Sequence, residues 1–371
     1  MKDIVKLGTL GDIFIGLTYR PEDVANEGTI VLRSSNIQNG KLDFTDIVRV
    51  KCKVRENLIV KPNDILMCSR NGSAKLVGKC TLLPKMDEEM SFGAFMTIIR
   101  TRHNPYLLHF FNSNAFRCQL GSAATTTINQ ITRRMLDDIS VPLYPKEQED
   151  YIVSLFNQID ELIWTETQKL ELFDELVKSR FIELFGDPNT NPMKWKKEPL
   201  QINATLLNGR AYKQDELLDN GKYPVLRVGN FFSNRGWYYS DLELDEDKYC
   251  DDGDLLYAWS ASFGPRIWNG GKVIYHYHIW KVLVGEKYNK QFLCHLLDYA
   301  TASLMGDTHG IGMMHLTKSG MEETEFIVPP IDLQNQFAAF VEQTDKSKLA
   351  VQQSITELEE LKESLMQKYF G

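Results

Sequence analysis

Residues 179–192 read SRFIELFGDPNTNP, and the first half of this stretch resembles the last residues of the chain, SLMQKYFG, at 364–371. Each of the two runs ends in an aromatic residue followed by glycine, a residue that commonly ends a helix. The two prolines and the turn residues of DPNTNP then prevent a helix from continuing. The middle of the chain therefore carries a copy of its own ending, which indicates an internal repeat.

A shift of 185 residues aligns the second parts of the two copies. It places Phe185 on Phe370 and Gly186 on Gly371, and it gives 14 identities over the 93 positions from 94 to 186. This identity alone is too low to convince, but one shift serves the whole run without a gap in its helical part. A period of about 185 residues is too long for a solenoid unit. The repeat therefore indicates two copies of one domain followed by one long helix.

The first part of each copy contains short runs of β-branched and aromatic residues, broken by Gly, Asn and Pro, which predict strands of an irregular, mostly β domain. The runs are TIVLRSSNI (29–37), DILMCS (64–69) and AFMTIIR (94–100) in one copy, and YPVLRVGNFF (223–232), DLLYAWS (254–260) and GKVIYHYHIWKVLV (271–284) in the other. A helix follows at 105–120 or 290–305, then a glycine-containing loop at 121–132 or 306–317, then a short strand ending in Val141-Pro142 or Val328-Pro329.

A long helix closes each copy. Its apolar residues recur in steps of three and four over about five heptads, which is typical of a coiled-coil seam. The seam residues are Ile152, Ile159, Leu170, Phe173, Val177, Phe337, Val341, Val351, Ile355, Leu358 and Leu365. Polar Glu166, Thr344 and Lys348 interrupt the seam, and such positions can set register and partner choice. A helix of roughly 55 Å, at 1.5 Å per residue, favours a separate two-helix stalk over ordinary amphipathic core helices.

These elements predict an α+β fold. We expect two mostly-β domains with small helices, each followed by a long helix, and the two long helices paired as an antiparallel coiled coil in a pseudo-twofold internal repeat. The expected boundaries are 1–144 for the first domain, 145–187 for the first long helix, 188–330 for the second domain and 331–371 for the second long helix. Gly186 and Gly371 are then expected at opposite ends of the helix pair.

Composition predicts a soluble cytoplasmic protein. The 371 residues are 43% hydrophobic and 25% charged, and no apolar run approaches the ~20 residues of a membrane span. The first residues lack the apolar core and cleavage site of a signal peptide. The six cysteines lie far apart with no C-x-x-C pair, which argues against a zinc site and a disulfide framework and suits reduced thiols.

The net charge of −8 gives no direct support for nucleic-acid binding, but the charge is unevenly distributed. Residues 1–140 hold 19 Lys+Arg against 14 Asp+Glu, a net of +5, whereas residues 141–187 carry −7. Residues 188–327 and 328–371 each carry −3. The acidic residues concentrate in the long helices and in one loop at 241–254, so the segments between them can still present a locally basic face.

The sequence contains none of the catalytic motifs that we searched for. The chain has no G-x-x-x-x-G-K-[ST] loop, no G-x-G-x-x-G after a strand and no Asn- or Asp-Pro-Pro-aromatic signature of amino-methyltransferases. His276 and His278 are expected on one face of a strand, but no Cys, Asp or Glu partner is suggested, so a packed or exposed pair is favoured over a metal site. The carboxylates of residues 245–254 lack calcium-loop spacing. We therefore expect no metal site and no enzymatic activity, and a role in binding or scaffolding.

Several motifs mark the junctions between the parts of the two copies. They are Val141-Pro142 with Glu147-Gln148, Val328-Pro329 with Leu333-Gln334, FGDPNTNPMKW at 185–195, and the paired openings VKLGTLGDIF at 5–14 and WKKEPLQINA at 195–204. With this order of elements, the whole chain resembles the specificity subunit of type I restriction–modification systems. The second opening departs from the family's usual Lys-Leu-Gly-Asp type of start, which leaves the first strand of that domain undefined.

The resemblance implies a function. In that family the two variable domains are target-recognition domains, each of which reads one half of a bipartite double-stranded DNA target. The helices form an antiparallel coiled coil that sets the spacing and docks two methyltransferase subunits. The subunit itself is non-catalytic and binds no cofactor; S-adenosylmethionine belongs to the methyltransferase subunits, and ATP with Mg²⁺ belongs to restriction subunits that can join the complex.

DNA bases are read by Arg, Lys, Asn, Gln, Ser or Thr side chains, so we looked for them in loops that occupy matching places in the two copies. In the first domain the candidates are Arg33, Ser34, Ser35, Asn36, Ser69, Arg70, Asn71, Ser73, Lys75, Thr125, Thr126, Thr127, Asn129, Gln130, Arg133 and Arg134. In the second domain they are Arg227, Asn230, Arg235, Trp259, Ser260, Ser262, Arg266, His309, Met314 and His315. Any one of these residues can instead be a surface turn residue without a DNA contact.

Arg33 and Arg227 occupy the same place in the two copies, which predicts a shared structural or phosphate role. The loops at 125–130 and 310–315 differ more and are better candidates for specificity. A dense set of aromatic residues, Trp259, Trp268, Tyr275, Tyr277 and Trp280, is expected to lie mainly in the core, with base stacking as the alternative.

A second hypothesis is a two-headed structural adaptor whose β domains bind protein or carbohydrate. The acidic total and the lack of a strong basic stripe favour it. A divergent nuclease or methyltransferase has no motif in its support.

Overall fold

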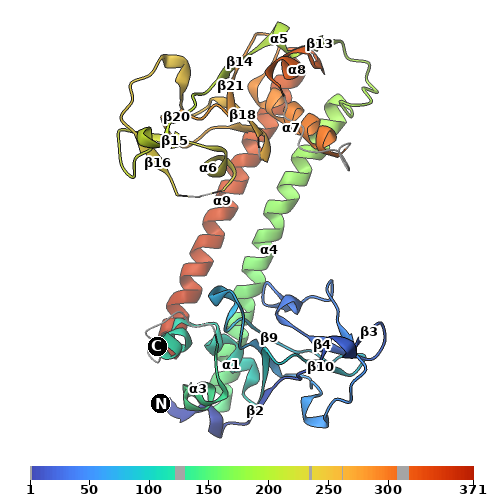
Figure 1. Ribbon diagram of the computed structural model, residues 1–371, viewed down its shortest axis with the longest axis vertical. Helices are drawn as coiled ribbons and strands as arrows, with labels where there is room; N and C mark the ends of the chain where they lie inside the picture. The colour runs from blue at the N-terminus through green and yellow to red at the C-terminus, as the bar shows by residue number, and fades with distance from the viewer. Residues whose placement is uncertain (1, 122–129, 234–235, 261, 307–316) are drawn as a thin grey trace. The chain divides into compact units, whose positions relative to one another are not determined.

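The structure is a computed structural model that describes residues 2–121, 130–233, 236–260, 262–306 and 317–371. The chain divides into two compact units, unit 1 with Met1–Thr167 and Gln352–Gly371, and unit 2 with Gln168–Val351. Each unit contains one sheet-rich domain and about half of each long helix (Figure 1). This division cuts the long helices α4 (Lys146–Phe185) and α9 (Ile331–Phe370), whereas the boundaries expected from the sequence keep them whole.

Two four-stranded sheets form the frame of unit 1. One has the order β2-β11-β8-β9 and is antiparallel, and the other has the order β10-β4-β7-β3 with β10 and β4 parallel. Strand β1 pairs with β12, and β5 with β6. The bounds are β1 (Asp3–Lys6), β2 (Asp12–Ile15), β3 (Val24–Ala25), β4 (Thr29–Leu32), β5 (Ile37–Gln38), β6 (Lys41–Leu42), β7 (Arg49–Val50), β8 (Ile65–Cys68), β9 (Cys80–Leu82), β10 (Met90–Phe92), β11 (Met96–Arg100) and β12 (Ser140–Leu143).

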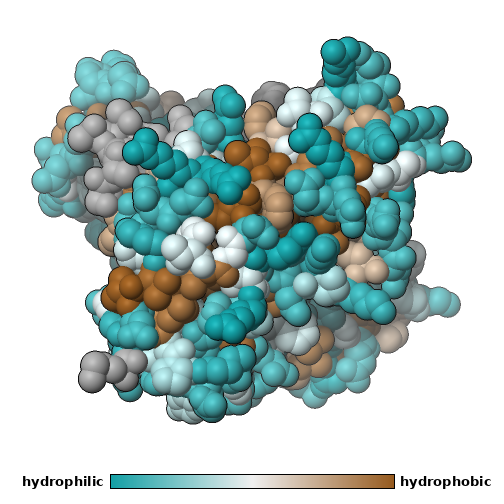
Figure 2. Space-filling view, turned by 90° about the horizontal axis from the view of Figure 1, so that it is seen from below, coloured by the Kyte–Doolittle hydropathy of each residue, from teal (hydrophilic) through white to brown (hydrophobic). Residues whose placement is uncertain are grey.

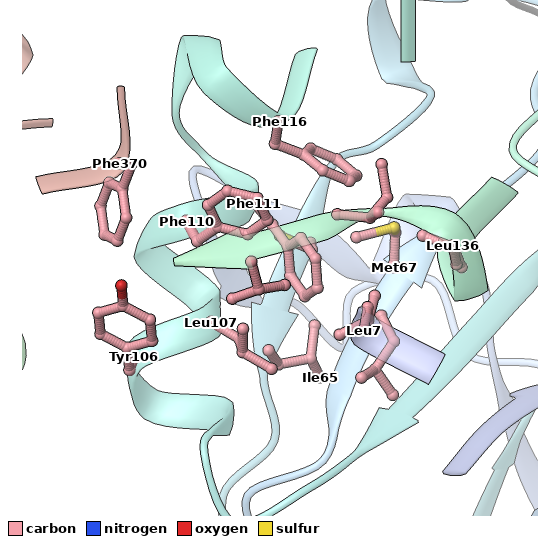
Figure 3. Close-up of a cluster of buried hydrophobic side chains, with 14 of the residues drawn as sticks. Leu7, Ile65, Met67, Tyr106, Leu107, Phe110, Phe111, Phe116, Leu136 and Phe370 are labelled. Carbon is pink, nitrogen blue, oxygen red and sulfur yellow. The ribbon is translucent and has the colours of Figure 1, made fainter. Parts of the chain in front are cut away.

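Aromatic side chains fill the main core of unit 1, which lies against α1 (Asn104–Phe111), α2 (Asn114–Gly121) and α3 (Arg133–Asp138) (Figure 3). Phe370, at the end of α9, packs edge-on to Tyr106 and Phe110 with ring centroids 5.4 and 5.8 Å apart. The Tyr106 hydroxyl donates to the Pro142 carbonyl in β12. Lys2 Nζ donates to the Gly371 carbonyl at 2.7 Å, so both chain ends lie in unit 1.

Unit 2 repeats this architecture. Its sheets have the orders β14-β21-β18-β19 and β16-β15-β20-β17, with β15 and β20 parallel, and β13 pairs with β22. The strands are β13 (Lys197–Pro199), β14 (Ala204–Asn208), β15 (Tyr223–Leu226), β16 (Tyr238–Ser240), β17 (Tyr249–Cys250), β18 (Leu255–Ser260), β19 (Ser262–Ile267), β20 (Val273–Tyr275), β21 (Ile279–Val284) and β22 (Glu325–Ile327). The helices are α5 (Leu200–Asn203), α6 (Val228–Phe232), α7 (Lys290–Gly306) and α8 (Lys318–Glu323).

Short 3₁₀ helices connect several strands in both units. They are η1 (Leu7–Thr9), η2 (Pro21–Asp23), η3 (Ser34–Asn36), η4 (Glu56–Leu58), η5 (Ala74–Leu76), η6 (Gln214–Glu216) and η7 (Glu246–Lys248). The core of unit 2 closes as that of unit 1 does: Phe185, at the end of α4, packs against Phe292 and Phe337 with ring centroids 4.6 and 5.7 Å apart. Phe185 thus has in unit 2 the place that Phe370 has in unit 1.

The sheet orders of the two units correspond strand by strand. The sheet β14-β21-β18-β19 matches β2-β11-β8-β9, and β20-β15-β16 matches β10-β4-β7. Only the fourth strand differs, because β3 lies beside β7 in unit 1 whereas β17 lies beside β20 in unit 2. The prediction of two mostly-β domains, each followed by a long helix, is confirmed.

Within each unit the two long helices contact each other. In unit 1, Phe156 stacks on Phe370 at 5.8 Å and Lys362 pairs with Asp160. In unit 2, Lys348 Nζ lies 2.5 Å from Asp174 Oδ1, and Phe181 packs edge-on to Phe337 at 5.4 Å. In each unit, later positions on α4 contact earlier positions on α9, so the helix segments are antiparallel there.

The predicted seam residues are all buried or partly buried. Lys348, predicted to interrupt the seam, has its charge paired, and the Thr344 hydroxyl donates to the Phe340 carbonyl at 2.9 Å. Gly186 ends α4 with a φ of 71° and donates its N–H to the Ile182 carbonyl at 2.8 Å, as expected of a helix stop. The placement of Gly186 and Gly371 at opposite ends of one helix pair stays a prediction.

Two predictions about local structure were wrong. The single helix expected at 105–120 is broken into α1 and α2, because the Ser113 hydroxyl donates to the Phe110 carbonyl at 2.6 Å and accepts from the Phe116 N–H at 3.4 Å. The single strand expected at 271–284 is divided into β20 and β21 by a turn. His276 and His278 therefore do not lie on one face of a strand.

Candidate nucleic-acid interface

In unit 1, residues 93–95 (Gly-Ala-Phe) form a tight turn that leads from β10 in one sheet to β11 in the other; we call it the crossover turn of unit 1. The Met96 N–H donates to the Gly93 carbonyl at 2.8 Å and closes the turn. The Ser69 N–H donates to the Phe95 carbonyl at 2.9 Å and fixes its second half. Gly93 is buried, whereas Phe95 is 58% exposed. The turn therefore has a fixed backbone and presents an aromatic ring to solvent.

Unit 2 has the same turn at residues 276–278 (His-Tyr-His), the crossover turn of unit 2. The Ile279 N–H donates to the His276 carbonyl at 2.9 Å, and the Trp259 N–H donates to the His278 carbonyl at 3.0 Å. Tyr277 is 38% exposed, and its ring centroid lies 3.9 Å from that of His278. The two units thus hold one backbone turn in the same place with different side chains.

A glycine underlies each crossover turn. A Cβ atom on Gly16 would lie 2.1 Å from the Gly93 carbonyl oxygen, and one on Gly209 would lie 2.4 Å from the His276 carbonyl oxygen. The next residue in each case forms a parallel bridge to the turn, Leu17 to Gly93 and Arg210 to His276. Only glycine permits this approach of two backbones, so the position of the turn is fixed from below in both units.

The segments 33–36 and 227–230, predicted to contact DNA, are held by matching caps. Asn36 Oδ1 accepts from the Arg33 N–H at 2.8 Å, and Asn230 Oδ1 accepts from the Arg227 N–H at 3.4 Å. Asn36 is 1% exposed, and its amide also donates to the carbonyls of Asp43 and Asp46. These contacts give Asn36 a structural role in place of the predicted DNA contact, because its polar atoms are used within the loop.

Candidates from two sequence loops meet in unit 1. Arg33, Ser34 and Ser35 line a pocket of about 640 Å³ together with the crossover turn. Asn71 Nδ2 donates to Ser34 Oγ at 3.2 Å, which ties the loop after β8 to the segment after β4. The Arg33 guanidinium lies 2.6 Å from the exposed carboxylate of Asp46, so Arg33 is partly neutralised.

Arg70 joins this group through the crossover turn. Its N–H donates to the Phe95 carbonyl at 3.1 Å, and its guanidinium lies over the Phe95 ring, 5.3 Å from the centroid. Arg70 also forms an antiparallel bridge with Gln130, a candidate from the third predicted loop. The Arg70 side chain is exposed, so a fixed backbone and an aromatic ring support a cation that faces solvent.

Other candidates of unit 1 lie apart from this group. Lys75 lines a different pocket, of about 330 Å³, with Lys79 and Arg117. The Ser73 N–H donates to Asn71 Oδ1 at 3.0 Å, and Arg133, at the start of α3, lies 3.7 Å from Asp137. Arg134 is exposed on α3.

In unit 2, Arg227 is exposed and lies over the Tyr238 ring at 5.2 Å. Ser260 and Ser262 face each other in the β18-β19 hairpin, in which a single residue separates the strands. Arg266 donates to the Phe231 carbonyl at 2.6 Å and so braces α6. The loop between β8 and β9, which holds Arg70, Asn71 and Lys75, is much longer than the connection between the matching strands β18 and β19.

The aromatic set in unit 2 is divided between core and surface. Trp268, Tyr275 and Trp280 are buried, as expected of core residues. Trp259 is partly buried, and its indole N–H donates to the Tyr277 carbonyl at 2.8 Å, which braces the crossover turn. The candidates Thr125, Thr126, Thr127, Asn129, Arg235, His309, Met314 and His315 lie outside the described residues.

Comparisons with known proteins agree with this architecture. The family model for the type I restriction modification DNA specificity domain matches residues 193–362. The specificity subunit of the type I restriction enzyme EcoKI from Escherichia coli K12 is 28% identical over 284 residues, which cover 69% of this chain and 60% of the EcoKI subunit. That of StySPI from Salmonella potsdam is 24% identical over 410 residues, which cover 98% of this chain and 87% of the StySPI subunit.

The chain is similar to type I specificity subunits over most of its length, and the family's domain model matches its second half. Solved structures agree in fold. A chain from a study of complex assembly and conformational transition of the type I R-M system has a TM-score of 0.63 at 16% identity, covering 100% of this chain and 97% of that one. The S subunit of a type I restriction-modification system from M. genitalium has a TM-score of 0.56 at 14% identity, with 100% and 96% covered.

The family model matches only the second half of this chain. The first half has the same strand order in one sheet and the same three-strand order in the other, with the same crossover turn and the same close glycine. The structure thus extends the likeness to unit 1 by fold.

Residue-by-residue reasoning on the sequence missed Phe95 and placed Tyr277 with the core. A signal was present, since GLTYRPED at 16–23 and GRAYKQDE at 209–216 share a Gly-x-x-Tyr-basic pattern. In both, an acidic side chain caps the following 3₁₀ helix, with Asp23 accepting from the Arg20 N–H and Glu216 from the Lys213 N–H. This shared pattern marks the strand end that contacts each crossover turn.

The imidazole of His276 is not a phosphate-binding cation at neutral pH. Burial, with smaller effects from His278 and Arg227, lowers the pKa of His276 to about 4. Among the described residues no three His, Cys, Asp or Glu side chains gather as metal ligands would. In the same part of the chain no helix has the length and apolar character needed to cross a membrane.

Proposed function

We propose that this chain is the DNA-specificity subunit of a type I restriction–modification complex, in which each domain reads one half of a bipartite duplex target. The observation that carries this proposal is the crossover turn, which has one backbone geometry in both units and different exposed side chains. Two readers of unlike half-sequences require such an arrangement, because a shared frame docks on the duplex and variable side chains contact base edges.

The long helices are suited to protein partners more than to DNA. Their segments carry net charges of −7 and −3, which repel phosphates. They also expose large apolar side chains, Leu162 and Trp164 in unit 1 and Leu172 and Leu349 in unit 2, each at least 50% exposed. We propose that the helices set the spacing between the domains and dock two methyltransferase subunits, which bind S-adenosylmethionine. Restriction subunits with ATP and Mg²⁺ would join that complex, and the subunit itself acts in the cytoplasm.

Phosphate contacts in unit 1 are proposed for the basic pocket that Lys75, Lys79 and Arg117 line. These side chains come from the loop before β9 and from α2 and line one pocket of unit 1. Cations of this kind position a protein on duplex DNA without selecting sequence.

The test is to co-express the chain with a type I methyltransferase subunit and to map methylated adenines over the host genome. A single bipartite motif is expected. Binding of the assembled complex to duplex DNA should also fall steeply with salt, because each phosphate contact releases counterions. Methylation without a common motif, or binding that salt does not weaken, would contradict the proposal.

The alternative of a structural adaptor for protein or carbohydrate gains no support from the comparisons. The relatives are named as specificity subunits of restriction enzymes, not as adaptors. The family model that matches residues 193–362 is described as a DNA specificity domain, which supports DNA recognition.

A further inference from the structure

We propose that the crossover turns are the specificity-determining elements of the two domains. In unit 1 the turn acts through the Arg70–Phe95 pair, and in unit 2 through the side chains of Tyr277 and His278. This inference rests on the proposed function, since it names the residues by which each domain would select bases.

The first observation in support is that the backbone of each turn is held by contacts that do not depend on the side chains that the turn carries. In both units the turn is closed by the same hydrogen bond, braced by the strand end that carries Ser69 or Trp259, and approached by a glycine. The fixed backbone aims whatever side chain the turn carries. Side chains can therefore differ between the units without a change in the frame, which suits a position that determines sequence preference.

In unit 1 the Phe95 ring holds the Arg70 guanidinium in place, which suits a contact from this arginine to a base. Phe95 is 58% exposed and holds the Arg70 guanidinium over its ring at 5.3 Å. Among the described residues no carboxylate lies within 4.0 Å of Arg70, whereas Arg33 has Asp46. A stacked guanidinium loses little freedom on binding. Bidentate donation from arginine to guanine O6 and N7 is the commonest specific base contact.

In unit 2 the corresponding strand end cannot supply such a reader. The N–H groups of Ser69 and Trp259 make the equivalent bonds to the two turns, so the next residue, Ser260, takes the place of Arg70. A serine hydroxyl is too short to extend past the turn. The turn residues instead offer Tyr277, exposed and packed against His278 at 3.9 Å, with hydroxyl and imidazole groups that can donate or accept.

The structure permits an exchange of the turns. A Cβ atom on Gly93 would meet its nearest atom, Val31 Cγ1, at an ordinary 3.7 Å, and Gly93 needs no left-handed backbone. A side chain can therefore begin at Gly93 without a clash of its Cβ, and the substitutions Gly93→His, Ala94→Tyr and Phe95→His, together with Arg70→Ser, would give unit 1 the turn sequence of unit 2.

The experiment maps methylated adenines, in cells that co-express a type I methyltransferase subunit, for the wild-type chain, the four-residue exchange and Arg70→Ala. Arg55→Ala is the matched control, since Arg55 is also an exposed arginine of unit 1. Arg70→Ala is expected to relax a guanine preference in one half of the motif by roughly 5- to 150-fold, the range for one bidentate pair. Arg55→Ala should leave every base preference unchanged.

The exchange should alter base preference in the same half of the motif and leave the other half intact. A wild-type bipartite motif that survives both changes, with every base preference kept, would overturn this inference and leave the proposed function standing. If the wild-type complex methylates no common motif, the proposed function itself fails.

A loss of all methylation by the exchange would indicate a misfolded unit, so Phe95→Leu serves as a milder variant. It keeps apolar volume but removes the ring under Arg70. A partial loss of the guanine preference, measured by competition between duplexes that differ at that base, supports the proposal; unchanged competition refutes it.

Discussion

The two units share one frame and differ in what the frame presents. In unit 1 an eleven-residue loop, 69–79, separates β8 from β9, and the crossover turn is Gly-Ala-Phe. In unit 2 a single residue separates β18 from β19, and the turn is His-Tyr-His. Yet the three-strand order β10-β4-β7 recurs as β20-β15-β16, and the other sheet is the same throughout.

The difference shows which interactions conserve a fold inside one chain. The repeated features are an asparagine whose side chain caps its own loop segment, a glycine under the turn, and a phenylalanine that closes the core. The variable features include the exposed side chains Phe95 and Tyr277. On the face seen in Figure 2, hydrophilic residues cover most of the surface and apolar residues gather in separate patches. A frame that tolerates surface change lets the two domains diverge in the side chains that they expose.

The largest expected effect comes from exchanging a whole domain. If the proposed function holds, replacing residues 1–144 with the corresponding domain of a type I specificity subunit should replace one half of the methylated motif completely and leave the other half. Mapping of methylated adenines with a co-expressed methyltransferase subunit measures this. Both half-motifs persisting unchanged would show that the domains do not read DNA separately.

Removing the phenylalanine that closes each core should destabilise only its own unit. Phe370 and Phe185 are fully or nearly fully buried, so Phe370→Ala and Phe185→Ala should each cost about 3–5 kcal/mol of unfolding free energy. Hydrogen–deuterium exchange in urea would report units 1 and 2 separately. Leu349→Ala, at a residue that is 62% exposed, is the control and should change little. If one substitution lowered the free energy of unfolding equally in both units, the two cores would not be independent, contrary to this prediction.

The glycines beneath the crossover turns should behave alike. Gly16→Ala and Gly209→Ala place a Cβ within 2.5 Å of a carbonyl oxygen, and such overpacking should cost about 1–3 kcal/mol. Gly72→Ala and Gly236→Ala are matched controls, because a Cβ there meets nothing within 4 Å. Unfolding free energies of the four variants test this; a neutral Gly16→Ala would mean that the turn moves freely.

The smallest expected effect is that of acidification, which should lower the free energy of unfolding of unit 2 more than that of unit 1. Burial lowers the pKa of His109 in unit 1, and of His276 and His295 in unit 2, to about 4 each. The unfolded state binds protons near pH 6.5, so stability present above that pH is lost as pH falls toward 4. By pH 5.5 each histidine should cost about 1 kcal/mol. Urea midpoints at pH 7.5 and 5.5 measure this loss. The variant His276→Asn should show a smaller difference between the two midpoints of unit 2.

The sequence predicted the long helices well because their signal is local and periodic. Apolar steps of three and four continue over many turns, so the seam residues and the helix stop at Gly186 follow from the chain alone. The internal repeat was also visible in the sequence, and none of the catalytic motifs that we searched for was found there. Short strands were less certain, as the division of 271–284 into β20 and β21 shows: a run of β-branched and aromatic residues does not reveal where a turn will interrupt it.

Only the tertiary structure decided which loops meet. The sequence proposed Asn36 as a DNA contact and overlooked Phe95. Yet Asn36 is buried with its amide bonded to two carbonyls, and Phe95 is exposed beneath Arg70. Both facts depend on pairing between strands far apart in the chain, such as β10 with β4 and β11 with β8. Residue type and spacing determine helices and repeats; exposure at a turn depends on long-range contacts, which only the folded chain fixes.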